Sequence, residues 1–296
     1  MVNKKLKVVE KQKNKISLTK IFILSIVASI LLLVTNSAFW INKQIFNTTN
    51  FTSAVTTSLT SESSRVAMAE RITDRIFADR AIARRVAGNL STQIVSGILA
   101  TDQFTGVLDS AVTRLHTYAS SSNQENIDID LTGIKDIIVK VTNASEALGK
   151  DIKIRADNVP DTITIIEESK IPDFYRLGVV FLWMAPVAFI FAVLLLAYPH
   201  LKYRNDTKSL LILQATIITL VGLFGLLFGP LFKPPVLSSI NEPSGRIIVS
   251  NIYDSFISTF NSQTLVMVSV GIIALFIGLF WYLYPTLKNI IRTNKN

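Results

Sequence analysis

The most regular feature of the sequence is a set of four long apolar segments separated by polar stretches. The first has no charged residue over the range 21–41, which at about 1.5 Å per residue extends roughly 31 Å, close to the hydrocarbon thickness of a bilayer. Segments of this length and composition indicate transmembrane helices. The pattern predicts four of them, at 21–41, 177–198, 210–231 and 265–284.

The long polar stretch at 42–176 has apolar residues at helical spacing in its first half. Helical runs at about 61–76 and 81–99, and a third after Thr101 that reaches Tyr118, predict a small antiparallel bundle. A serine or threonine at position 60 or 61 is suited to cap the first of these helices.

The second half of this stretch changes its period. Residues 127–131 alternate apolar and polar as a half-buried strand does, and helical spacing returns from Ile134 to Gly149. Two further runs, 152–155 and 162–166, have strand character. The fold class predicted is therefore a mainly α membrane protein, with four transmembrane helices, an extracytoplasmic helical bundle and a small α/β appendage.

A second polar stretch, 232–264, contains a predicted amphipathic helix. Ile248, Ile252, Phe256 and Phe260 recur four residues apart and would form an apolar stripe. An unpaired stripe outside the membrane is an aggregation liability. We therefore predict that this helix extends the fourth span and packs against the bundle of the first polar stretch.

Charge decides the orientation of these segments. The first twenty residues hold seven lysines and one glutamate, and the stretches 199–209 and 285–296 are also basic. The positive-inside rule places these three segments in the cytoplasm. The predicted organisation is a cytoplasmic tail at 1–20, an extracytoplasmic domain at 42–176, a cytoplasmic turn at 199–209, a second extracytoplasmic loop at 232–264, and a cytoplasmic tail at 285–296.

The first apolar segment also has an alternative interpretation, as a cleaved signal peptide. Ser37 and Ala38 are small, and the most apolar run, 21–34, is short. Asn36 occupies the −3 position where a small residue is wanted, and Phe39 and Trp40 are typical of an interfacial anchor. These residues favour a retained span.

Composition narrows the class of protein further. The chain is 49% hydrophobic with a mean hydropathy of +0.42, which is high for a soluble protein. Its net charge of +9 resides in the predicted cytoplasmic segments, so we expect no nucleic-acid partner. The chain has no cysteine, so disulfides and thiolate chemistry are excluded.

No phosphate-binding loop, zinc-protease motif, nucleophile elbow or dinucleotide fingerprint occurs in the sequence. The two histidines, His116 and His200, fall on opposite sides of the membrane in the predicted topology. None of the four predicted spans contains an ionisable residue, unlike most ion-coupled transporters. The sequence therefore predicts no catalytic, cofactor-binding or metal-binding residue.

Small and polar residues inside the spans have a structural interpretation. Gly222, Gly225 and Gly229 would let the third span approach another helix closely. Gln214, together with Thr216 and Thr219, is more typical of interhelical contacts than of a substrate path.

Three groups of polar residues outside the spans have side chains that could bind a ligand or carry a modification. Asp128 and Asp130 have a spacing that suits a divalent cation, but a solvated strand face is favoured. The arginines interleave with acids along the first two helical runs, which favours an ion-paired face over a grip on lipid headgroups or wall polymer. Those arginines are Arg71, Arg75, Arg80, Arg84 and Arg85. The N-x-S/T sequons at Asn47, Asn50, Asn89 and Asn143 are attributed to chance in a Thr/Ser-rich chain.

The order of these parts resembles a group of uncharacterised bacterial integral membrane proteins, mostly actinobacterial, over nearly the whole chain. The likeness rests on segments 65–77, 104–116, 127–131 and 251–260. This chain departs from the group in its short approach to the second span, at 166–175. The resemblance implies four spans, a large helical extracytoplasmic loop and a cell-membrane location; it supplies no activity.

These observations lead to a functional hypothesis. We expect a non-enzymatic protein of the plasma membrane that binds or organises a partner at the cell surface through its extracytoplasmic domain. Besides the lipid bilayer, the partner would be a protein or an anionic surface polymer. The alternatives are a small-solute or lipid transporter, and a membrane enzyme acting on lipid or cell-wall precursors.

Overall fold

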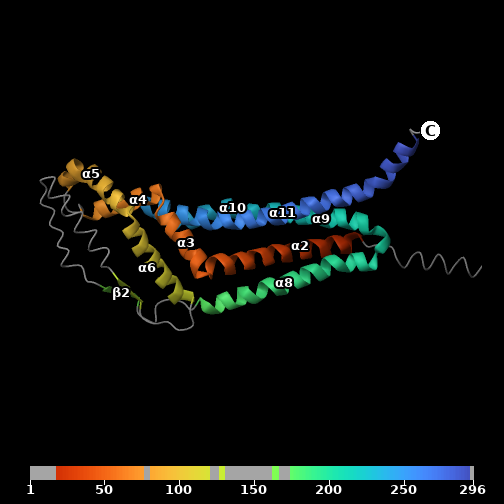
Figure 1. Ribbon diagram of the computed structural model, residues 1–296, viewed down its shortest axis with the longest axis horizontal. Helices are drawn as coiled ribbons and strands as arrows, with labels where there is room; N and C mark the ends of the chain where they lie inside the picture. Colours follow the sequence, from red (N-terminus) through yellow and green to blue (C-terminus); the bar gives the residue numbers. More distant parts are fainter. Residues whose placement is uncertain (1–17, 77–80, 121–126, 131–161, 167–173, 294–296) are drawn as a thin grey trace, which may run out of the picture. The chain divides into compact units, whose positions relative to one another are not determined.

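A computed structural model of the chain describes residues 18–76, 81–120, 127–130, 162–166 and 174–293 (Figure 1). The described part is mainly α-helical, as the sequence predicts. It divides into two compact units, described separately below. Unit 1 comprises Met1–Phe39, Leu182–Phe228 and Phe260–Asn296, and unit 2 comprises Trp40–Phe181 and Gly229–Thr259.

Four helical segments are long and apolar enough to cross a membrane, the property that indicates an integral membrane protein. They are Leu18–Ile45, Tyr175–Lys202, Arg204–Ser238 and Pro243–Pro285. Their helices are α2 (Leu18–Trp40), followed by the short π-helix η1 (Ile41–Ile45), α8 (Tyr175–Lys202), α9 (Thr207–Leu226), α10 (Phe228–Ser238) and α11 (Pro243–Thr293). Each predicted span lies within one of the four segments.

The third segment differs from the single helix expected at 210–231. Helix α9 ends at Leu226 and α10 begins at Phe228. The physical reason is Pro230, because it has no N–H to donate to the Leu226 carbonyl four residues earlier. The N–H of Leu227, at the end of α9, donates to the carbonyls of Phe224 and Gly225.

Small residues bring the helices of unit 1 close together, as the sequence predicts. A β-carbon at Gly222 would lie 2.8 Å from Val268 Cγ2 of α11, and one at Gly225 would lie 2.8 Å from Leu33 Cδ1 of α2. Helix association in lipid depends on such close packing, since lipid chains are as apolar as the helices themselves. These glycines therefore position α9 against α2 and α11.

Polar side chains add hydrogen bonds between the helices of unit 1. The Gln214 amide on α9 donates to the Leu196 carbonyl on α8 at 3.0 Å, and its oxygen lies 2.8 Å from His200 Nε2. Because that amide oxygen can only accept, Nε2 of His200 is the donor. Gln214 thus has the interhelical role predicted for it. The hydroxyls of Thr216 and Thr219 donate to carbonyls of their own helix. Thr219 nevertheless has the predicted interhelical contact, because a β-carbon at Gly271 of α11 would lie 3.1 Å from its backbone nitrogen.

Unit 2 contains the predicted helical bundle together with one helix that the sequence did not indicate. The expected helices are α4 (Glu62–Ile76), α5 (Ala81–Leu99) and α6 (Asp102–Ser120); the additional one is α3 (Thr48–Leu59). Helix α4 packs against α5 around Ala69, Val95 and Leu99, and α3 packs against α6. The bundle is therefore built from two helix pairs rather than from three helices.

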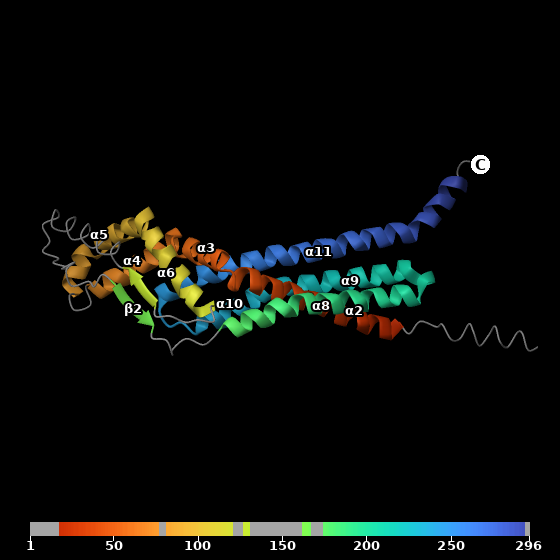
Figure 2. The same ribbon diagram turned by 60° about the horizontal axis from the view of Figure 1, so that its bottom comes forward.

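The strand predictions at the two ends of the appendage are confirmed. Strands β1 (Ile127–Asp130) and β2 (Thr162–Ile166) pair antiparallel, with Ile129 opposite Ile163 (Figure 2). The helix expected at 134–149 and the strand-like run at 152–155 lie outside the described residues. Most of the predicted cytoplasmic tail at 1–20 does as well.

Helix α11 joins the predicted amphipathic helix to the fourth span. It continues over 51 residues without interruption, from Pro243 to Thr293, with Pro285 inside it. The prediction that the loop helix extends the fourth span is confirmed. The first part of α11, up to Thr259, belongs to unit 2, where it meets the bundle.

Candidate functional site

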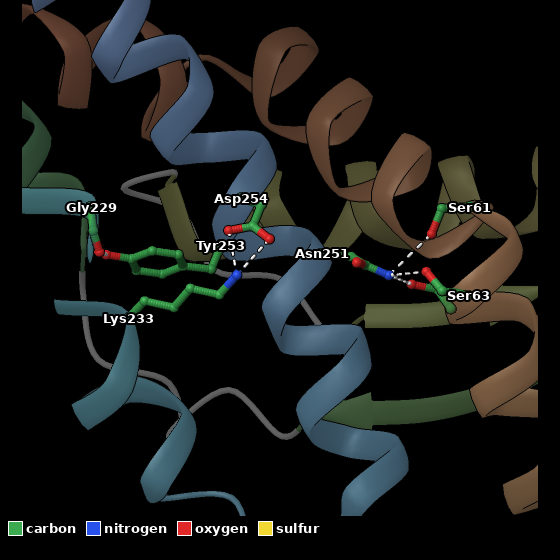
Figure 3. Close-up of polar contacts among 8 residues, drawn as sticks. Ser61, Ser63, Gly229, Lys233, Asn251, Tyr253 and Asp254 are labelled. Atoms are coloured by element: carbon green, nitrogen blue, oxygen red, sulfur yellow. Dashed lines mark hydrogen bonds and ion pairs between the residues drawn. The ribbon is translucent and has the colours of Figure 1, made fainter. Parts of the chain in front are cut away.

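The first part of α11 carries polar side chains that contact two different helices of unit 2. Figure 3 shows Asn251 directed toward the start of α4, and Tyr253 and Asp254 directed toward α10. Nδ2 of Asn251 lies 2.7 Å from Ser64 Oγ and 2.8 Å from Ser63 Oγ, with Ser61 Oγ at 3.2 Å. An amide nitrogen has two hydrogens, so the three serine hydroxyls share them.

Tyr253 and Asp254 hold α11 to α10. The Tyr253 hydroxyl donates a 2.8 Å hydrogen bond to the Gly229 carbonyl, and Lys233 Nζ lies 2.6 and 2.7 Å from the two Asp254 carboxylate oxygens (Figure 3). This ion pair is partly exposed, and such pairs contribute about 1 kcal/mol or less. The contacts fix the position of α10 rather than create a reactive centre.

Two further contacts join the second polar stretch to the bundle. The Phe51 and Phe256 rings have centroids 5.5 Å apart, and Arg71 pairs with Glu242 at 3.1 Å. Together with Asn251, they confirm the prediction that the loop helix packs against the bundle. Glu242 is a partner that the sequence did not indicate for Arg71. Arg84 pairs with Asp74, one of the interleaved acids, as expected of an ion-paired helix face.

A groove lined by hydroxyl groups lies between α3 and α6 and has a volume of about 380 Å³. Thr52 Oγ1 lies 3.1 Å from Thr113 Oγ1, and the Thr56 hydroxyl donates to Asp109 Oδ1 at 3.4 Å. Asp109 itself is exposed. The lining residues are Thr48, Thr49, Thr52, Ser53, Thr56, Thr57, Asp109 and Thr113.

The sequence signal for this groove was the spacing of its hydroxyl residues. Thr48, Thr52 and Thr56 recur four apart, and Thr49, Ser53 and Thr57 repeat the same interval one position later. Rows at this interval share one face of a helix. Threonine has a low helix propensity, so a segment of this composition does not by itself predict a helix.

His116 lies at one end of α6 and is 6% exposed. Its Nε2 is 2.6 Å from the Ile45 carbonyl oxygen, and its Nδ1 is 3.1 Å from Thr48 Oγ1. Since a carbonyl only accepts, Nε2 carries the proton and Nδ1 can accept from the Thr48 hydroxyl. The ring also packs against Phe51, with centroids 4.4 Å apart. His116 thus joins η1, α3 and α6.

The other candidate residues outside the spans have the following places. Asp128 and Asp130 both lie in β1, and among the described residues no group of three or more His, Asp or Glu side chains is arranged to hold a metal ion. Asn47 caps α3 by accepting from the Asn50 N–H, and Asn50 donates to the Lys43 carbonyl. Asn143 and Arg80 lie outside the described residues.

Unit 1 contains a second concave feature, an apolar cleft of about 780 Å³ between α2, α8 and the α9–α10 segment. It is lined by Ile26, Ile30, Leu33, Val34 and Ser37 of α2, by Met184 of α8, and by Leu220, Val221, Phe224 and Phe228. No sequence pattern indicated this cleft, because lipid-facing and cleft-facing apolar residues have the same composition.

Fold and sites together define a helical protein with four segments able to cross a membrane and a second unit that contains a hydroxyl-lined groove. No protein-family model, no curated protein and no solved structure matches this chain. The four spans agree with the architecture implied by the bacterial membrane proteins described above. Membership of that group stays a prediction.

Proposed function

We propose that this protein is a bacterial plasma-membrane protein whose two termini lie in the cytoplasm and whose unit 2 binds a protein partner at the cell surface without enzymatic chemistry. Support for the location comes from the four apolar segments and from the basic residues that flank their predicted inner ends. With both termini in the cytoplasm, residues 42–176 and 232–264 would lie outside the cell. A retained first span is part of this proposal.

The observation that carries the proposed binding role is the groove between α3 and α6. Its hydroxyls supply both donors and acceptors, repeated every four residues, which is about 6 Å along a helix. Asp109 adds an exposed carboxylate. A groove of this kind suits a peptide segment, whose amide groups both donate and accept and whose lysine or arginine can pair with Asp109.

An anionic surface polymer is less well suited to this groove. The lining residues include an acid and no basic side chain. An anionic polymer would need basic side chains to bind it. Two of the arginines that could serve this purpose, Arg71 and Arg84, are paired with acids. A protein partner is therefore favoured over the polymer, which becomes an outcome of the test.

The test is site-specific crosslinking in intact cells. A photoreactive residue at Ser53, which lines the groove, should give one defined crosslinked protein band, whereas the same residue at the exposed Gln93 of α5 should not. When Asp109→Lys is added to the variant with the photoreactive residue at position 53, the intensity of that band should fall at least fivefold. The proposal would be contradicted by the absence of a specific band from position 53, or by a band that Asp109→Lys does not change. A crosslinked product that glycan-degrading enzymes remove would contradict it as well.

A further inference from the structure

The apolar cleft of unit 1 has the length of one bilayer leaflet. Along α2 its lining extends from Ile26 to Ser37, eleven residues apart, or about 16 Å at 1.5 Å per residue. Half of a hydrocarbon core of about 30 Å is 15 Å. The stretch of α2 that lines the cleft is therefore about as long as one leaflet is thick, and it lies around the middle of the predicted first span.

Two of the three walls of the cleft lie toward the same end of the spans. The lining of α2 lies around the middle of the predicted span, whereas Leu220 to Phe228 lie in the last part of α9 and the start of α10. Met184 lies in the first third of α8, which crosses in the opposite direction. In the proposed orientation the residues of α8 and of the α9–α10 segment come from the outer half of the bilayer, so the inference rests on the proposed membrane location and not on the groove of unit 2.

The chemistry of the lining requires a hydrocarbon occupant. Ser37 is the polar residue among the lining side chains, and its hydroxyl donates to the Leu33 carbonyl at 2.9 Å. Ordered water needs two to four polar partners, which such a lining does not offer. A volume of about 780 Å³ lies within the usual range for small-molecule sites.

A transmembrane helix of another protein is a poorer occupant than a lipid chain. Helices in membranes pair through small residues that allow the backbones to approach. The glycines of α9 are already in contact within unit 1, Gly222 with Val268 and Gly225 with Leu33. The cleft instead presents large flexible or aromatic side chains such as Met184 and Phe224, against which a polymethylene chain can pack.

We propose that this cleft binds one acyl chain of a phospholipid and retains it when the surrounding bilayer is removed. Burial in the cleft keeps the apolar chain out of water, so the chain remains bound where detergent does not compete effectively. Because the lining has no charged group, the site selects for the chain and not for the headgroup. The protein would thus carry a structural lipid between α2, α8 and α9.

The experiment counts retained lipid on the full-length protein. Protein reconstituted into vesicles of dioleoyl phosphatidylcholine is extracted again in mild detergent and measured by native mass spectrometry. We expect about one lipid per chain for the wild type. Leu220→Trp, which fills the cleft, should lower that occupancy at least tenfold.

A matched control lies one turn away on the same helix. Leu223 is 46% exposed, against 59% for Leu220, and is not among the residues lining the cleft, so Leu223→Trp should retain the lipid. The gel-filtration profile reports whether each variant folds. If Leu220→Trp does not fold, Ile30→Phe fills the cleft from α2 and should cause the same loss of retained lipid. The inference would be overturned if the wild type retained no lipid or if the two tryptophan variants retained it equally. It would also be overturned if the protein formed a dimer that the cleft-filling substitutions abolish. A protein absent from the membrane fraction would instead contradict the proposed location.

Discussion

Nδ2 of Asn251 lies 2.8 Å from the Ser63 hydroxyl, although 188 positions separate the two residues in the chain (Figure 3). The contact joins α11 to the first turn of α4. It is reinforced by Ser64, whose side chain is fully buried and accepts from the same amide at 2.7 Å. A hydrogen bond to a buried hydroxyl specifies how the second polar stretch attaches to the bundle.

Replacing Asn251 should therefore loosen unit 2. Asn251→Ala removes the donor from three serine hydroxyls, one of them buried, and we expect a loss of about 1–3 kcal/mol in the free energy of unfolding. Pulse proteolysis in urea on the purified full-length protein would measure it.

Lys233→Ala provides the control for the Asn251 prediction. It breaks an exposed ion pair between α10 and the same helix, and we expect a change of about 1 kcal/mol or less. A smaller effect of Asn251→Ala than of Lys233→Ala would show that the amide contact does not stabilise the attachment.

A charge on the apolar side of α11 should expose the bundle to protease. Ile252 is half-buried, and Ile252→Asp places a carboxylate where an apolar side chain packs, at a cost of several kcal/mol. Ile252→Val retains the apolar contact and should behave as wild type within about 1.5 kcal/mol. If Ile252→Asp inserts normally and keeps wild-type resistance to protease, the two polar stretches are independent.

The close approach of α9 and α11 should make Gly222 intolerant of a side chain. A β-carbon there would lie 2.8 Å from Val268 Cγ2 and 3.6 Å from the Val268 backbone, so Gly222→Ala should lower the free energy of unfolding by about 1–3 kcal/mol. Thermal unfolding in detergent would show this as a fall of several degrees.

Gly97 is the matched control for Gly222. A β-carbon at Gly97 would have no neighbour within 4 Å, so Gly97→Ala should be neutral or stabilise α5 by up to about 1 kcal/mol. Equal effects of the two alanine substitutions would mean that helix propensity, and not the contact between α9 and α11, decides the outcome at Gly222.

The proposed orientation predicts the behaviour of reporter fusions. Fusions after Lys13, Ser121, Asn205, Pro243 and Asn296 should report inside, outside, inside, outside and inside, because basic residues stay in the cytoplasm. Paired alkaline phosphatase and fluorescent protein reporters would measure the two locations. An exterior C-terminus would contradict the orientation.

The sequence by itself determined the spans and most helices of unit 2. A segment such as 21–41, with no charge and the length of a bilayer, has no alternative to a helix in lipid, since every backbone N–H and C=O must be paired within the segment. The helices α4, α5 and α6 were predictable because their apolar residues repeat at helical spacing. The end of α9 was missed because Pro230 lies inside an apolar run, where composition does not locate a break.

Only the tertiary structure decided α3 and the two concave features. The α3 segment is rich in threonine, so its helix depends on the Asn47 cap and on packing against α6, neither of which a local pattern reveals. The partner of Asn251 and the cleft lined by Leu33 and Leu220 depend on residues far apart in the chain. Local spacing determines which face of a helix is apolar or polar, but the packing of whole helices determines what that face meets.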